Sequence, residues 1–280
     1  MRRRPPFSSA LRGSLALALL LVAALLPVAP ASAIVPLPPH PWIQTIPPRT
    51  AVEPHPSAEI CLQAGVLCPD LTMRAPYQLK PDRWHGWKML RAANAVLSIG
   101  PGPAEVRGTR TGPGVMDAVQ YVHRAGGQRP LAVPGGAGNL LFKHIPGQGG
   151  YWKFANAAKF ELWTTGANPR LVRTGPKLTY CLRDLRKLWN WDRSPRRFVY
   201  PGCSRNPNRK KVTLGTSVGW ADIYPAPYYE QWIDVTGLRG CFDLLHIADP
   251  DNHIVELDET NNTAKTRVRL PMGKRKVSRC

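Results

Sequence analysis

Residues 265–270 read KTRVRL, and this short stretch decides the fold class. Small or apolar residues alternate in it with basic ones: Thr266, Val268 and Leu270 with Lys265, Arg267 and Arg269. A period of two places one face of a strand on a core and the other in water. The stretch therefore predicts a strand that is half buried in a sheet.

Similar short segments lie on the N-terminal side of this strand. Residues 103–108, 159–163 (KFELW), 231–235 (QWIDV) and 242–248 (FDLLHIA) are β-rich and end at turn residues. The segments DPDN (249–252) and ETNN (259–262) predict turns. Only residues 117–124 (DAVQYVHR) and 181–189 are predicted as short helices. The pattern indicates an all-β fold, a β-sandwich-like core with long loops and a few short helices.

The composition limits the function classes. The chain has 280 residues, of which 30 are proline and 43% are hydrophobic, which excludes a helical bundle and wholesale disorder. Lysine and arginine number 38 against 18 acidic residues, a formal charge of +20. Such a surface attracts polyanions without choosing among them.

The two ends of the chain differ in composition from its body. Residues 1–33 combine four arginines, an apolar run and an A-x-A site, which predicts a cleaved secretory signal peptide. Residues 34–57 predict a Pro-rich linker, residues 58–271 the β domain and residues 272–280 a basic tail. Loss of the signal lowers the formal charge from +20 to +16. We expect a secreted protein, extracellular or in the cell envelope, with no stable membrane anchor and no nucleic-acid partner.

Six cysteines follow the signal segment, and export favours disulfides. Cys61 and Cys68 are near enough in sequence to close a small loop, and Cys181 with Cys203 a longer one. Cys241 and Cys280 remain, as a third pair or as free thiols. Six cysteines allow fifteen connectivities, so the sequence leaves these alternatives open.

Two stretches carry a family resemblance. GPKLTYCLRD (175–184) places a lysine four residues before the cysteine of a CL pair, and GTSVGWADIYPAPYYEQWIDVTGLRG (215–240) leads from a G-W-x-D-x-Y pattern into QWIDVT. Both resemble the catalytic domain of the lysyl oxidases, secreted copper amine oxidases that convert peptidyl-lysine amines to aldehydes. Weaker similarity at residues 94–108 and 249–270 extends the resemblance over most of residues 69–270. A bacterial-type secreted member is implied.

The resemblance implies a self-made cofactor, lysine tyrosylquinone, which forms when copper and oxygen oxidise a tyrosine and a lysine amine adds to its ring. By the family's motifs the lysine corresponds to Lys177 and the tyrosine to Tyr224. Ordinary alternatives are a surface lysine in a basic chain and a tyrosine packed at a sheet edge. The neighbouring Asp222 and Glu230 offer local acidity to a cationic substrate, or are ordinary surface charge.

The family's copper motif, H-x-H-[WY]-H, has no intact counterpart. In the corresponding run, Gly149, Tyr151 and Lys153 occupy the positions of the three imidazoles. Glycine, a neutral phenol and an ammonium are poor substitutes for neutral histidine as copper ligands. His144 is the only histidine nearby, and we expect no metal ligand there. The sequence therefore predicts no bound cofactor; copper and lysine tyrosylquinone are expected only if the protein is active.

Other chemistries are weakly indicated. GTSVG (215–219) has the outline of a nucleophile elbow around Ser217, but no strand-turn-helix pattern follows it. The glycine-rich run at 126–139 lacks the lysine of a phosphate-binding loop and is interpreted as a loop. Glu256, Asp258 and Glu259 offer oxygen ligands for calcium, although a solvated turn is the favoured interpretation.

Aromatic and basic residues are interleaved between residues 177 and 211. Trp189, Trp191 and the arginines around them form either a cation-π surface for a polyanion or a part of the core. The leading hypothesis is a non-catalytic lysyl-oxidase-like domain that binds an anionic envelope or matrix polymer. The alternative is an active copper-dependent amine oxidase that acts on peptidyl-lysine or primary amines, with protein lysines as partners.

Overall fold

The computed structural model describes residues 48–49, 52–228, 230–272 and 280. The predicted signal peptide, most of the Pro-rich linker and residues 273–279 of the basic tail lie outside the described residues. No helix among the described residues has the length and apolar character that crossing a membrane requires.

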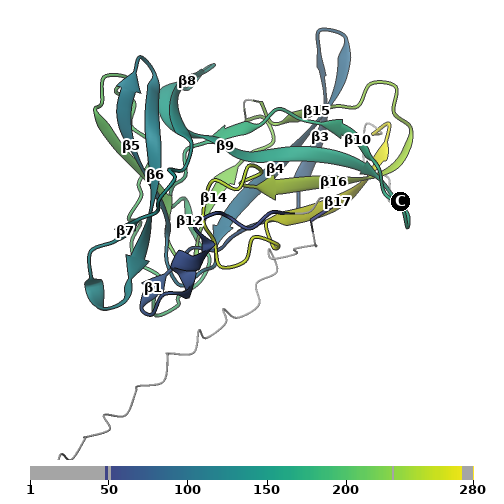
Figure 1. Ribbon diagram of the computed structural model, residues 1–280. Coiled ribbons are helices and arrows are strands. Elements are labelled where there is room, and N and C mark those ends of the chain that lie inside the picture. The colour runs from purple at the N-terminus through teal and green to yellow at the C-terminus, as the bar shows by residue number, and fades with distance from the viewer. Residues whose placement is uncertain (1–47, 50–51, 229, 273–279) are drawn as a thin grey trace, which may run out of the picture. The chain divides into compact units, whose positions relative to one another are not determined.

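The described chain consists mostly of β-strands, which confirms the all-β class (Figure 1). Its helical elements are two 3₁₀ turns, η1 (Ala58–Leu62) and η2 (Ala125–Gly127). The strands are β1 (Val66–Leu67), β2 (Leu71–Met73), β3 (Tyr77–Trp84), β4 (Trp87–Ser98), β5 (Ala104–Gly112), β6 (Val115–Arg124), β7 (Leu131–Ala132), β8 (Asn139–Ile145), β9 (Gly149–Thr164), β10 (Leu171–Thr174), β11 (Leu178–Tyr180), β12 (Arg186–Lys187), β13 (Lys211–Thr216), β14 (Trp220–Tyr224), β15 (Trp232–Asp234), β16 (Gly240–Ala248) and β17 (Thr263–Leu270).

Two antiparallel sheets carry these strands. The larger runs in the order β13-β5-β6-β8-β9-β16-β17, with β1, β7, β10 and β11 attached at its sides. The smaller runs β12-β14-β4-β15, and β2 and β3 also pair with β4. The long strands β9 and β4 therefore organise one sheet each, and side chains of both meet in one core.

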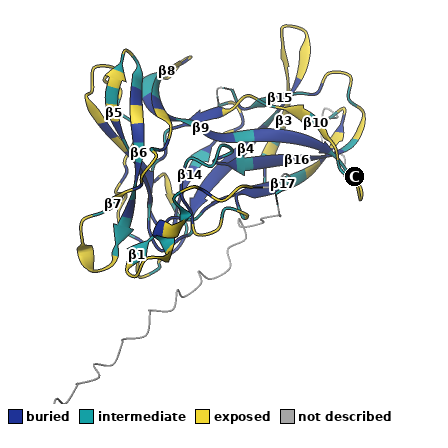
Figure 2. Cartoon of the chain, viewed as in Figure 1, coloured by how far each residue is buried: buried dark blue, intermediate teal, exposed yellow. Residues whose placement is uncertain are grey.

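The period of two at the C-terminal end matches the burial of β17. Val268 and Leu270 are buried, whereas Arg267 and Arg269 are exposed. β17 pairs with β16, and β16 pairs with β9. Buried strand faces recur along β4, β9 and β16 in Figure 2. Burying one aliphatic side chain of this size stabilises the fold by about 1.5–3 kcal/mol.

The other predicted strands are also found. Residues 103–108 fall largely in β5, 159–163 in β9, 231–235 around β15 and 242–248 in β16. The turn at residues 249–252 is present, and Asp249 and Asn252 there have positive φ angles of 39° and 52°. Asp and Asn accept this left-handed conformation more readily than most residues, which is why they end the strand.

Both helix predictions are wrong. Residues 117–124 belong to β6, in which Met116, Ala118, Gln120 and Val122 are buried at every second position. This period of two outweighs the helical propensity of the segment, because β5 and β8 pair with β6 on either side. Residues 181–189 form a loop with the two-residue strand β12, which the edge of β14 fixes by pairing.

The three disulfides are Cys61–Cys68, Cys181–Cys203 and Cys241–Cys280. The first two confirm the pairs predicted from spacing, and the third settles the alternative for the remaining cysteines. Disulfides are typical of proteins in oxidising, extracellular compartments.

Candidate functional site

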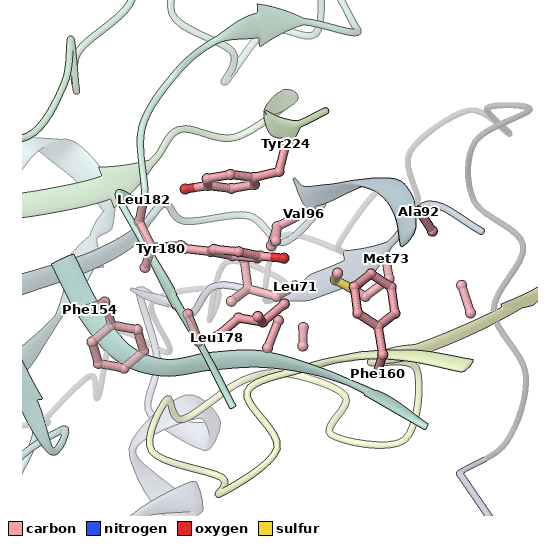
Figure 3. Packing of buried hydrophobic residues seen from close by; sticks show 14 of the residues in the cluster. Leu71, Met73, Ala92, Val96, Phe154, Phe160, Leu178, Tyr180, Leu182 and Tyr224 are labelled. Atoms are coloured by element: carbon pink, nitrogen blue, oxygen red, sulfur yellow. The ribbon is translucent and has the colours of Figure 1, made fainter. Parts of the chain in front are cut away.

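Tyr224, the predicted cofactor tyrosine, lies at the end of β14 and is buried. Its ring stacks on that of Tyr180, with centroids 3.8 Å apart and planes 13° from parallel (Figure 3). Tyr228 meets the same ring edge-on at 4.8 Å. The smaller sheet supplies Tyr224 and the larger one Tyr180, so the two rings join the sheets.

A polar network surrounds the hydroxyl of Tyr180 inside the core. Asn94 on β4 donates to it at 2.9 Å, and the hydroxyl donates to Gln231 at 3.0 Å. Gln231 in turn donates to the carbonyl of Pro225 at 2.8 Å. His246 contacts the same hydroxyl at 3.4 Å, and burial holds its pKa well below the ordinary value. The network fixes the QWIDV segment against the tyrosine pair.

The hydroxyl of Tyr224 has two partners of its own. It donates to the Asp222 carboxylate at 2.6 Å and accepts the backbone N–H of Cys181 at 2.8 Å. Burial, then the negative charge of Asp222, raises the pKa of Tyr224 well above its usual value. Burial also raises the pKa of Asp222 to about 7. The phenol is therefore held in its neutral form. Asp222 is fully buried, so its interpretation as ordinary surface charge is wrong.

Lys177, the predicted cofactor lysine, lies just before β11. Its amine is 2.6 Å from the Asp251 carboxylate, and its side chain is 47% exposed. Asn156 donates to the other oxygen of Asp251 at 2.8 Å. No hydrogen bond or ion pair between the described residues joins Lys177 to Tyr224, since the amine is engaged at the 249–252 turn and the phenol in the core. Their assignment as a cofactor pair stays a prediction.

The positions that correspond to the histidine motif lie at the start of β9. Gly149 has a φ of 94°, and a side chain there would meet the Arg205 guanidinium at 2.7 Å. Tyr151 turns away and donates to the carbonyl of Gln148 at 2.5 Å. His144, on the paired strand β8, faces Gly150 and is exposed. The positive φ at position 149 would strain any side chain there, including an imidazole.

Lys153 is the third motif position, and it points into the core with 1% of its surface exposed. Its amine donates to the hydroxyl of Tyr228 and lies 4.5 Å from the centre of that ring. Burial, assisted by the charge of Lys143, lowers the pKa of Lys153 to about 8. Lys143 is itself paired with Glu230 at 2.7 Å. Tyr228 thus contacts both the Lys153 amine and the ring of Tyr224.

A second group of carboxylates is buried between the start of β2 and the turn before β17. Glu256 is 4% exposed and accepts from the side chain of Asn262 at 2.9 Å, so a solvated turn is wrong for this residue. Asn261 donates to Asp70 at 2.8 Å. Burial raises the pKa values of Asp70 and Glu259 to about 7. Among the residues that the structure describes, no group of three or more His, Cys, Asp and Glu side chains is arranged to hold a metal ion.

The basic segment, residues 183–211, contains β12, which pairs with the edge of β14, and ends at the first residue of β13. Its ten basic residues are Arg183, Arg186, Lys187, Arg193, Arg196, Arg197, Arg205, Arg209, Lys210 and Lys211. Of its two acidic residues, Asp184 is buried and accepts backbone N–H groups of Val199, Tyr200 and Ser217. Trp189 is part of the core, whereas Trp191 is half-buried with Arg193 over its ring. The core interpretation is therefore confirmed for Trp189, and Trp191 packs against the same cluster; a polyanion surface stays a prediction.

The C-terminal half of the chain is similar in sequence to a known protein family. Residues 147–280 match the family model for lysyl oxidase. This part of the chain is similar to the lysyl oxidases. The matched range includes Gly149, Tyr151, Lys153, Lys177, Tyr224 and all strands from β9 onward. No curated protein matches the chain. The lysyl oxidases use copper and lysine tyrosylquinone, which makes the chemistry around Lys153 the decisive feature.

The sequence did not predict the contacts that Tyr180, Asp222 and Lys153 make in the site. Asp222 and Tyr224 are two positions apart on a strand and so share a face, a signal that predicts their contact. Tyr180 had no comparable signal, because its stacking partner lies on another sheet. Lys153 was noted only as a failed ligand, although the alternation along β9 places it with the buried residues.

Proposed function

We propose that the protein is a secreted, non-catalytic lysyl-oxidase-like domain that binds an anionic extracellular or cell-envelope polymer. The three disulfides and the signal-like segment at residues 1–33 support export. The absence of catalysis and the polymer binding rest on separate features of the molecule.

The observation that carries the non-catalytic part is the buried amine of Lys153. An ammonium at this place repels a copper ion and offers no lone pair while it is protonated. The glycine and the phenol at the other two motif positions add no imidazole. The residues present therefore do not fit copper, and no catalytic step is derived through it. Lys177 and Tyr224 alone support the competing function, an active copper amine oxidase.

The basic segment supports the binding part. Arg196, Arg197 and Arg209 are exposed, and Asp192 is its one exposed carboxylate. Lys210 and Lys211 continue the positive surface to Arg110 on β5, where they border a shallow hollow. Closely spaced cations of one sign attract a polyanion in a salt-dependent manner.

Binding to a sulfated dextran at low and high salt tests this function. Replacing Arg196 and Arg197 with Gln should weaken binding roughly tenfold, or about 1.4 kcal/mol, because two phosphate- or sulfate-binding charges are lost. Arg170→Gln with Arg173→Gln, two exposed arginines around β10, provides the matched control and should leave the affinity unchanged. Binding that is insensitive to salt, or equal effects of the two double variants, would contradict the proposal.

A further inference from the structure

Two tryptophans lie exposed at the tip of the β3–β4 hairpin. Trp84 and Trp87 pair across the strands and are 51% and 56% exposed. The turn residues His85 and Gly86 have φ angles of 46° and 85°, typical of the two-residue turn that fits the twist of a hairpin. In Figure 1 a blue hairpin projects above the label of β3, and Figure 2 shows it as exposed. Exposed tryptophans in such a pair mark an interaction site.

The ring of Trp84 is held in place from below. It stacks on Trp232 of β15 at 5.8 Å with planes 25° apart. The Arg91 guanidinium lies 5.0 Å from the centre of the Trp232 ring and pairs with Asp82 at 2.5 Å. The aromatic tip is therefore ordered before any partner binds, which reduces the entropy lost on binding.

Cations lie on the other face of the same tip. Arg83 and Lys88 form the next pair in the register, and successive pairs of a hairpin point to opposite faces. Together with Arg239 they line a hollow of about 600 Å³. Within the described part of the chain no carboxylate forms an ion pair with these three side chains, since Asp82 is engaged by Arg91. The hollow is also lined by Asp82 and by apolar side chains, those of Met89, Val235, Leu238, Leu270 and Met272.

We propose that this hairpin tip binds the surface of an anionic lipid membrane. Tryptophan rings favour the boundary between hydrocarbon and water, because the ring is apolar and its N–H remains solvated. Lysine and arginine are attracted to anionic headgroups. When a projecting tip enters the headgroup layer, lipid surrounds it, so the tryptophans on one face and the cations on the other both make contact. A sugar chain lies along one face and would contact either the tryptophans or the cations. The hollow then receives a lipid phosphate beside its cations and an apolar chain against its apolar side chains.

Co-sedimentation of the full chain with vesicles tests this proposal. The probes are phosphatidylcholine vesicles with and without roughly one quarter phosphatidylglycerol, at low salt and at about 0.5 M salt, where exposed charges are screened. At low salt we expect binding to the anionic vesicles and not to the vesicles of phosphatidylcholine alone. At high salt, the tryptophans should retain part of the binding to the anionic vesicles. Trp84→Ser with Trp87→Ser should weaken this binding at least tenfold and abolish the salt-resistant part.

Two controls separate this site from the basic segment. Phe198→Ser removes an aromatic side chain that is 60% exposed in that segment and should leave vesicle binding intact. Sulfated dextran binding should be unchanged in the Trp84→Ser, Trp87→Ser variant, whose thermal midpoint confirms folding. Equal vesicle binding by that variant and the unchanged chain would overturn the proposal. Loss of dextran binding by the variant would also overturn it, because the tip would then be assigned to a polysaccharide. Vesicle binding without dextran binding would refute only the proposed polymer function.

Discussion

Among single residues, Lys153 links the sequence most directly to the chemistry. A buried ammonium loses its hydration, and its contacts with the Tyr228 hydroxyl and ring replace only part of it. Burial therefore lowers the pKa of Lys153 to about 8. The side chain therefore costs stability at neutral pH.

Replacing Lys153 with Met should stabilise the protein at neutral pH. The pKa is near 8 in the folded state and near 10.5 in the unfolded state, so the unfolded state binds more protons between these values. The unchanged protein therefore gains stability as the pH rises through this window. Lys153→Met should be more stable by up to about 3 kcal/mol at pH 7, and the difference should shrink toward pH 10.

Urea unfolding at both pH values measures this difference. Lys177→Met is the matched control, because that amine is largely exposed and its ion pair is worth about 1 kcal/mol or less. Tyr228 is only half-buried, so its hydroxyl can turn to water in the variant. If Lys153→Met is less stable than the unchanged protein at pH 7, or if their difference in stability does not depend on pH, the contacts of the buried amine compensate for its lost hydration and the prediction is wrong.

For single residues, the sequence shows which residues stand at the positions of the histidine motif, but it does not predict what surrounds them. Gly149, Tyr151 and Lys153 are recognised from the motif, yet only the fold shows that Lys153 is buried and that a side chain at position 149 would meet Arg205. The burial of Asp222 depends on the packing of β14 between β4 and the basic segment, which no local pattern encodes.

Among the elements, the basic segment is unusual because it has little regular structure. The Cys181–Cys203 disulfide links a cysteine just before the segment to one within it and so closes a loop over most of its length. The buried Asp184 accepts the backbone N–H groups of Val199 and Tyr200 in the segment and of Ser217 beyond it. The cations are thus presented on a loop that is fixed by a covalent bond and a few polar contacts. Removal of the disulfide should loosen this loop before the sheets.

The variant Cys181→Ala with Cys203→Ala should lose about 3 kcal/mol of stability, since the disulfide closes a loop with a sequence separation of 22. Trypsin should then cleave first within residues 183–211. The matched control, Cys61→Ala with Cys68→Ala, opens a loop with a separation of 7 and should cost about 2 kcal/mol without exposing the basic segment. Unchanged cleavage within residues 183–211 in the first variant would refute this account.

Strands at the C-terminal end are predictable because their alternation coincides with burial on one face. The wrong helix prediction for β6 has a physical reason. The segment DAVQYVHR fits a helix by composition, but β5 and β8 pair with β6 on its two sides, so its alternation of buried and less buried residues decides for a strand. The cross-sheet stack of Tyr180 on Tyr224 has no sequence signal, because it depends on how two sheets pack.

For the molecule as a whole, the excess of positive charge coexists with buried carboxylates. Burial raises the pKa of Asp70 and Glu259 to about 7 and that of Asp249 to about 6. Burial also raises the pKa of Glu256 well above its usual value, with the charge of Glu259 adding to the effect. These groups favour the protonated form in the folded state, which links the stability of the fold to pH.

The thermal midpoint should fall as the pH rises from about 5 to about 8. The folded pKa values lie above the unfolded ones, so the stabilisation is fully present below the unfolded pKa and is lost as the pH passes through 6 to 7. Measurements in chelator-treated buffer exclude bound divalent cations. Glu259→Gln should flatten the dependence, whereas replacing the exposed Glu59 with Gln should not. A midpoint that rises over this range would contradict the assignment.

The proposed function is non-catalytic, so the protein should neither hold copper stoichiometrically nor form lysine tyrosylquinone. The most direct test is metal analysis combined with peptide mass mapping of the secreted protein after expression with copper. The account predicts less than stoichiometric copper and separate, unmodified peptides for Lys177 and Tyr224. Stoichiometric copper together with a covalent cross-link between Lys177 and Tyr224 would contradict it.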